Sequence, residues 1–243
     1  MALLELTGVT KRFGGLTAVD HVDLTVNEGE VLGLIGPNGA GKTALFAMIA
    51  GYLKPTEGKI VFKDRDITGM ETYKIAHMGM NRTFQVVRPF GDMTVLENVM
   101  VGAMMRDANV KRAREKAMET LSFCGLKENA DFLGRELTVA KKKRLEVARA
   151  LASDPSLLLL DEVMAGLTPS EVQDATKFIF QIHDKGITLL VIEHVMEVIM
   201  PISDRVAVLN YGKKIVDCKP QEAIENPDVI AAYFGSTEEA ATC

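Results

Sequence analysis

Residues 31–50 read VLGLIGPNGAGKTALFAMIA. The apolar run 31–35 predicts a short buried strand, and residues 44–50 favour a helix that ends at Gly51. Between them, residues 36–43 match the pattern G-x-x-x-x-G-K-[ST] at every fixed position. A strand, a glycine-rich loop and a helix in this order predict an α/β fold with a phosphate site at the loop.

The chemistry of the glycine-rich loop explains how it would hold a phosphate. Glycines let the backbone N–H groups approach and wrap the anion, and the following helix presents its positive end. Lys42 is expected to reach the β- and γ-phosphates, and the Thr43 hydroxyl to bind Mg²⁺. The residues expected to bind the nucleotide here are Gly36, Pro37, Asn38, Gly39, Ala40, Gly41, Lys42, Thr43 and Ala44.

Such a loop works together with a carboxylate that binds the metal ion, usually at the end of a buried strand. Leu157–Leu160 is an apolar run followed directly by Asp161 and Glu162. We expect Asp161 to hold Mg²⁺ through water and Glu162 to activate an attacking water molecule. The alternative is that both are ordinary acids at the end of a strand.

The remaining sequence predicts the regions around this core. Alternating apolar residues in 4–26 indicate an N-terminal antiparallel β subdomain. Residues 87–154 are rich in Ala, Lys, Arg and Glu and contain a capping box at Thr94, which indicates an inserted helical lobe. After Pro155, apolar strands alternate with helices, the first of which has Thr168 as its N-cap.

Together these regions predict a P-loop NTPase core, α/β in class, with a mostly parallel sheet. We expect one nucleotide-binding domain over 1–235 and a disordered tail over 236–243.

Composition excludes several classes of protein. The 243 residues include 28 basic and 33 acidic ones, a net charge of −5, so a basic nucleic-acid footprint is absent at the level of the whole chain. No apolar run approaches the roughly 18 residues of a membrane span. Three cysteines are too few for a disulfide framework or a zinc site, and the first residues do not form a secretory signal. Action at a membrane through a partner chain remains possible.

The order of motifs resembles the nucleotide-binding subunit of an ABC transporter, over about residues 3–235. The resemblance implies that Phe13 in KRFGG stacks on adenine, near Val19. It implies that Gln85 in RTFQ senses the γ-phosphate and binds Mg²⁺, and that His194 in VIEHVM contacts the γ-phosphate. Taken alone, Phe13 and His194 could be core residues and Gln85 a solvated one. The catalytic residues implied are Glu162, His194 and Lys42, and the metal ligands are Thr43, Gln85 and Asp161.

Within that family, four segments resemble the branched-chain amino-acid uptake subgroup. They are RTFQ, TVLENVMVGA, AGLTP and AAYFG. The function implied is ATP hydrolysis, with ATP and Mg²⁺, at the cytoplasmic face of the membrane. The implied partners are a second ABC ATPase subunit, identical or different, transmembrane permease subunits, and indirectly a solute-binding protein, but not a nucleic acid. Alternatives are an importer of urea or an aromatic acid, a lipid exporter, and a soluble ABC ATPase acting on DNA or ribosomes.

The family signature LSGGQ is altered in this chain. The matching residues 137–141 are LTVAK, so Thr138 keeps a hydroxyl, Ala140 replaces a glycine and Lys141 replaces the glutamine. Lysines oppose the macrodipole at a helix N-terminus, and a bound phosphate would relieve that cost. We expect the signature to engage ATP less tightly than the standard form, partly because alanine adopts a positive φ only at a cost. Val163 and Thr168 also replace a usual proline and aspartate.

Overall fold

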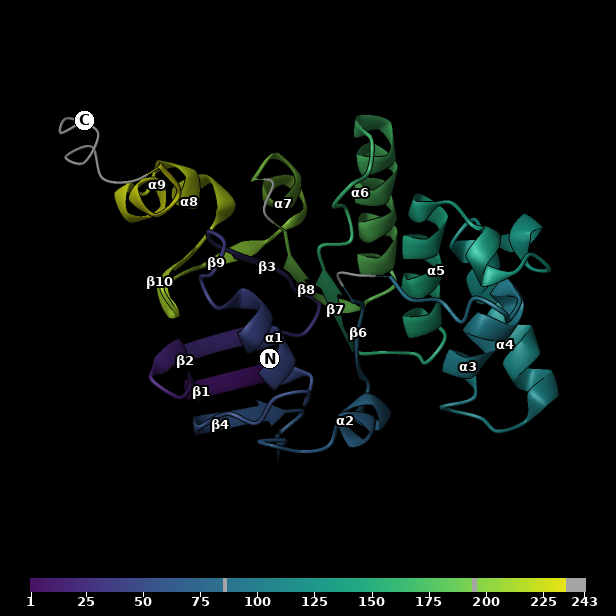
Figure 1. Ribbon diagram of the computed structural model, residues 1–243, viewed down its shortest axis with the longest axis horizontal. Helices are drawn as coiled ribbons and strands as arrows, with labels where there is room; N and C mark the ends of the chain where they lie inside the picture. The colour runs from purple at the N-terminus through teal and green to yellow at the C-terminus, as the bar shows by residue number, and fades with distance from the viewer. Residues whose placement is uncertain (85–86, 194–195, 235–243) are drawn as a thin grey trace. The chain divides into compact units, whose positions relative to one another are not determined.

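The computed structural model describes residues 1–84, 87–193 and 196–234 (Figure 1). The chain divides into two compact units. The first contains Met1–Ile75 and the described residues from Thr188 onward, and the second contains Ala76–Ile187. No helix in the three described ranges has both the length and the hydropathy needed to cross a membrane. The predicted tail 236–243 lies outside the described residues.

The first unit contains the expected antiparallel sheet (Figure 1). Its strands are β1 (Ala2–Phe13), β2 (Leu16–Asn27), β4 (Glu57–Phe62) and β5 (Arg65–Asp66), in the order β2-β1-β4-β5. Gly14 and Gly15 form the turn between the first two strands. The alternating apolar residues of β1 and β2, such as Leu4 and Leu24, are buried, while the residues between them are mostly partly or fully exposed.

A second, mostly parallel sheet of the first unit is built on β3 (Val31–Ile35), whose five residues are all buried. It pairs in parallel with β8 (Thr188–Ile192) and β9 (Arg205–Asn210). β10 (Lys213–Cys218) pairs antiparallel with β9. Helices of this unit are α1 (Lys42–Ile49), α7 (Met196–Ile202), α8 (Pro220–Glu225) and α9 (Pro227–Phe234), and α2 (Thr72–Met78) carries the chain toward the second unit.

The second unit combines a short parallel strand pair with helices. β6 (Met80–Arg82) pairs with the fully buried β7 (Leu157–Asp161). Its helices are α3 (Val95–Ala103), α4 (Val110–Phe123), the 3₁₀ turns η1 (Lys127–Asn129) and η2 (Gly134–Glu136), α5 (Val139–Leu151) and α6 (Pro169–His183). The capping boxes predicted at Thr94 and Thr168 are both formed. The sequence had not predicted β6, which has only three residues.

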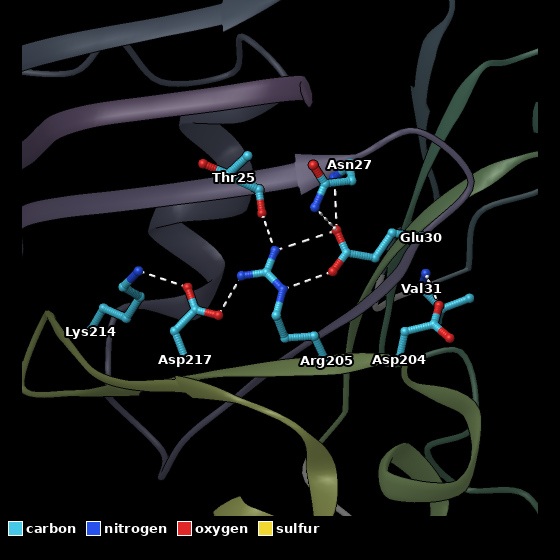
Figure 2. Close-up of polar contacts among 8 residues, drawn as sticks. All are labelled: Thr25, Asn27, Glu30, Val31, Asp204, Arg205, Lys214 and Asp217. Carbon is cyan, nitrogen blue, oxygen red and sulfur yellow. Dashed lines mark hydrogen bonds and ion pairs between the residues drawn. The ribbon is translucent and has the colours of Figure 1, made fainter. Parts of the chain in front are cut away.

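One guanidinium group holds together the two sheets of the first unit (Figure 2). Arg205 of β9 donates from Nε to Glu30 Oε1 at 2.8 Å, and it also bonds Asp217 of β10 and the carbonyl oxygen of Thr25 in β2. Glu30 in turn accepts the Asn27 N–H at 2.7 Å. The hydrogen bond from Glu30 raises the pKa of Arg205 above its usual value. The arginine therefore joins β9 and β10 to the end of β2.

Replacing this arginine should destabilise the protein, because the partly buried Glu30 would lose its cation and Asp217 would keep only Lys214. We expect Arg205→Met to lower the free energy of unfolding by about 2 kcal/mol, measured by urea denaturation. The matched control is Lys59→Met, which removes a pair with Asp66 whose side chains are 58% and 51% exposed. That change should cost less than about 0.5 kcal/mol. Equal losses in the two variants would contradict this role for Arg205.

Candidate functional site

The glycine-rich loop lies between β3 and α1, and two of its glycines pack where a side chain cannot fit. Gly36 has a φ of 146°, and a Cβ on it would lie 2.1 Å from the carbonyl oxygen of Leu209 in β9. Gly41 has a φ of 99°, and a Cβ there would lie 2.3 Å from the carbonyl oxygen of Ala18. The strands beneath the loop therefore determine its shape, and glycine is required at both positions.

Lys42 forms hydrogen bonds with the backbone of its own loop. Its side chain is buried, and Nζ donates to the carbonyl oxygens of Gly36 at 2.6 Å and Pro37 at 2.9 Å. By contrast, Asn38 and Gly39 at the tip of the loop are exposed, as is Thr43 in the first turn of α1. The Lys42 ammonium group thus contacts the loop backbone at two carbonyl oxygens. Thr43, the next residue in the chain, is exposed. The predicted roles of Lys42 toward a phosphate and of Thr43 toward Mg²⁺ stay predictions.

A tyrosine that the sequence analysis missed also contacts this loop. The N–H of Gly36 donates to the Tyr233 hydroxyl of α9 at 2.8 Å. Burial raises the pKa of Tyr233, so the phenol stays neutral and can accept this bond. The two residues are separated by 197 positions, and no motif signals their contact.

The two residues expected near adenine differ in exposure. Phe13 ends β1 and is 47% exposed, with the Lys11 ammonium 5.1 Å from its ring centre. Its ring can therefore stack on a planar ligand. Val19 of β2 is completely buried, and its Cγ2 lies 3.4 Å from the position that a Cβ on Gly41 would occupy. In this structure Val19 supports the loop, and its predicted contact with a nucleotide stays a prediction.

The predicted carboxylates lie in the second unit. Asp161 ends β7 and is 1% exposed, and Glu162 follows it at 6%. Arg82 of β6 donates from a terminal nitrogen to Asp161 Oδ2 at 2.6 Å, so the buried carboxylate has a cationic partner. The Asp161 N–H donates to the Thr83 hydroxyl at 3.1 Å. Arg82 was not predicted from the sequence, because no spacing rule connects residues 79 positions apart.

The altered signature forms the start of α5. Thr138 is the N-cap, and its hydroxyl accepts the Lys141 N–H at 3.4 Å. Ala140 lies in the first helical turn and has no positive φ, so the backbone cost expected for alanine does not arise here. Thr138 and Lys141 are both exposed and Ala140 is partly so. These three side chains are therefore accessible to a ligand that is bound to another protein molecule.

Further along α5, a buried acid contacts the segment that leads to one of the predicted ligands. Glu146 accepts the Phe84 N–H at 3.1 Å, and burial raises the pKa of this carboxyl. Phe84 directly precedes Gln85 in the sequence. Gln85 itself and His194 lie outside the described residues, so their predicted roles stay predictions.

The donor set suits Mg²⁺ better than a transition metal. Carboxylate and hydroxyl oxygens are hard ligands, and Mg²⁺ usually takes one or two protein carboxylates together with phosphate oxygens. The predicted ligands Asp161 and Thr43 each carry an oxygen donor of this kind. The described part of the chain contains no group of three or more His, Cys, Asp or Glu residues that could hold a metal ion.

The shape of the loop gives a testable prediction. Gly36→Ala should lower the free energy of unfolding by about 3 kcal/mol or more, because its Cβ would collide with a strand carbonyl at a positive φ. Gly39→Ala is the matched control, since Gly39 also has a positive φ but nothing lies within 4 Å of its Cβ position. It should cost about 1 kcal/mol. Thermal and urea denaturation without nucleotide would measure both, and similar losses would contradict the packing argument.

The pair between Arg82 and Asp161 gives a further prediction. Arg82→Met should cost about 3 kcal/mol of stability, because it leaves a buried carboxylate without its cation. Adding Asp161→Asn should recover part of that loss, so that the double-mutant cycle gives a coupling of about 2 kcal/mol. Urea denaturation of the four proteins measures the coupling, and strictly additive losses would contradict it.

Comparison with known proteins shows the family of this chain. The sequence profile of the ABC transporter family matches residues 19–165. The chain is 40% identical to the high-affinity branched-chain amino acid transport ATP-binding protein LivG of Salmonella typhimurium, covering 96% of this chain and 98% of that protein. It is 39% identical to the corresponding protein BraF of Pseudomonas aeruginosa, with the same coverage.

Solved structures of ABC transporter cassettes also resemble this chain. A nucleotide-free ATP-binding cassette from an ABC transporter has a TM-score of 0.89 and 32% identity, covering 97% of this chain and all of that one. The ADP conformation of an ATP-binding cassette of an ABC transporter has a TM-score of 0.88 and 33% identity, with the same coverage. The glycine loop, the strand-end carboxylates and these matches along the whole chain agree, and the chain belongs to the ABC transporter family.

Proposed function

We propose that this chain is the ATP-hydrolysing subunit of an importer for branched-chain or related amino acids. The observation that carries the proposal is the full-length match to branched-chain amino acid transport ATP-binding proteins, combined with a complete glycine loop and paired carboxylates. The identity of the solute is part of the proposal, because the permease subunits and the solute-binding protein, and not this chain, would select it.

At the reacting phosphate, the residues of the chain would have separate tasks. Lys42 and the loop N–H groups would stabilise the charge on the transferring phosphoryl group, together with His194. Glu162 would orient and polarise the attacking water in line with the bond that breaks. Phe13 would stack on the adenine ring.

Thr43, Asp161 and Gln85 would hold Mg²⁺, which supplies positive charge to the phosphate oxygens.

We further propose that two such subunits, identical or different, enclose ATP head to tail. The loop of one chain would face the signature of the other, so that Thr138, Ala140 and Lys141 meet the partner's nucleotide. The exposure of Thr138 and Lys141 at the start of α5 supports this. The γ-phosphate would hold the dimer closed through charge-assisted hydrogen bonds, and hydrolysis would open it. Permease subunits would receive this motion at the cytoplasmic face of the membrane.

The proposal is tested by reconstituting the chain with its permease subunits and binding protein in vesicles. We expect ATP-dependent uptake of labelled leucine, and Glu162→Gln should lower hydrolysis and uptake by about 100-fold or more while ATP still binds. Glu119→Gln, which changes an exposed carboxylate of α4, is the matched control and should leave both rates unchanged.

The same preparation separates this function from its alternatives. Membrane-fraction association of the chain should require co-expressed permease. Uptake of urea or an aromatic acid but not leucine would overturn the proposed solute. A chain that pellets with ribosomes or DNA and ignores the permease would overturn the transport function altogether.

A further inference from the structure

The turn that begins at Glu162 has a strained first residue. Glu162 has a φ of 49°, in the left-handed region that costs a residue with a side chain roughly 1–2 kcal/mol. The turn is closed by the Ala165 N–H, which donates to the Glu162 carbonyl oxygen at 3.2 Å. A second bond runs from the Leu167 N–H to the Met164 carbonyl oxygen, also at 3.2 Å. A strained conformation of this kind persists only when its surroundings fix it.

Packing on one side of this turn is incomplete. A cavity of about 190 Å³ is lined by Leu160, Val163 and Leu167 on the side of the turn, and by Phe178 and Ile182 of α6. The side chains of the turn therefore border open space where a well-packed core would supply contacts. On this side, polar contacts can therefore contribute to holding the turn in place.

Lys143 of α5 lines the same cavity and reaches across to the turn. Its Nζ donates to the Glu162 carbonyl oxygen at 3.0 Å and to the Ala165 carbonyl oxygen at 2.6 Å. These acceptors are the first and last residues of the turn, so one ammonium group joins its two ends. The Glu162 carbonyl oxygen thereby accepts from both Ala165 and Lys143, which uses both of its lone pairs.

The burial of Lys143 suggests that this contact is specific. The residue is only 8% exposed, although an ammonium group is costly to remove from water unless it is well hydrogen-bonded. Its neighbours Lys141 and Lys142 on the same helix are exposed and partly exposed. Lysine also has the geometry for the task, because its three N–H donors can serve several carbonyl groups at once.

We propose that Lys143 is a positioning residue that fixes the backbone on which Glu162 stands. α5 begins at Thr138, so the helix that carries the signature also holds the turn carrying the catalytic carboxylate of the same chain. Without Lys143 the turn would relax out of its strained form, and Glu162 would no longer aim its carboxylate at water. The proposal rests on the proposed function for the role of Glu162 alone, and the contact itself can be tested without nucleotide.

The experiment compares Lys143→Met with the wild-type chain in two measurements. Amide hydrogen exchange without nucleotide should be faster at Ala165 and Leu167 in the variant, and unchanged in β3 and α1. Mg²⁺-dependent ATP hydrolysis should then fall in kcat by about 10- to 100-fold, with the Kd for ATP unchanged, because misplacing a catalytic group has effects of that size. Lys143→Arg, which keeps donors at this position, should recover part of both effects.

Lys142→Met is the matched control, since it removes a cation from the adjacent position of α5 without touching the turn. It should resemble wild type in both measurements. Unchanged exchange at Ala165 and Leu167 in Lys143→Met would overturn the proposal, and so would faster exchange with an unchanged kcat. If circular dichroism shows that Lys143→Met does not fold, Lys143→Gln takes its place, with intermediate exchange supporting the proposal and wild-type exchange overturning it. A wild-type chain without ATPase activity would contradict the proposed function, while the exchange result would still judge the contact.

Discussion

The close approach of the Gly36 backbone to the carbonyl oxygen of Leu209 is the contact on which the loop geometry depends. It leaves no room for a side chain, so the direction in which the chain leaves β3 is set by the neighbouring strand. Gly41 repeats the constraint against Ala18 at the other end of the loop. Because both ends are fixed in this way, Lys42 can reach back to the carbonyl groups of Gly36 and Pro37. The loop is thus organised by the sheet before any ligand binds.

The second unit follows a different principle, in which buried charges are matched one by one. Asp161 has Arg82 as its partner, Lys143 has two carbonyl groups, and Glu146 has the N–H of Phe84. Each of these groups would be costly to bury alone. Each also lies on or beside a segment that carries a predicted catalytic or metal-binding residue. The polar contacts therefore define conformations that apolar packing alone would leave free to vary.

The sequence predicted the parts that local patterns encode. The strand-loop-helix segment, the hairpin of β1 and β2, and the helix starts at Thr94 and Thr168 follow rules that act within a few residues, and all are confirmed. The three-residue β6 was missed because its burial comes from pairing with β7, not from its own pattern. Arg82, Lys143, Tyr233 and Arg205 were missed for a related reason. Their partners are distant in sequence. The sequence alone does not distinguish a solvated basic or aromatic side chain from one that is hydrogen-bonded.

The pairing of Arg82 with Asp161 has a consequence for how the chain is made. A protein that gathers bare carboxylates for a cation often folds only when the cation arrives, since repulsion and desolvation oppose the empty form. Here an arginine from the neighbouring strand neutralises the carboxylate from the start. Folding of the chain should therefore not depend on the cation that Asp161 is proposed to bind. The chain can therefore fold first and bind the cation afterwards.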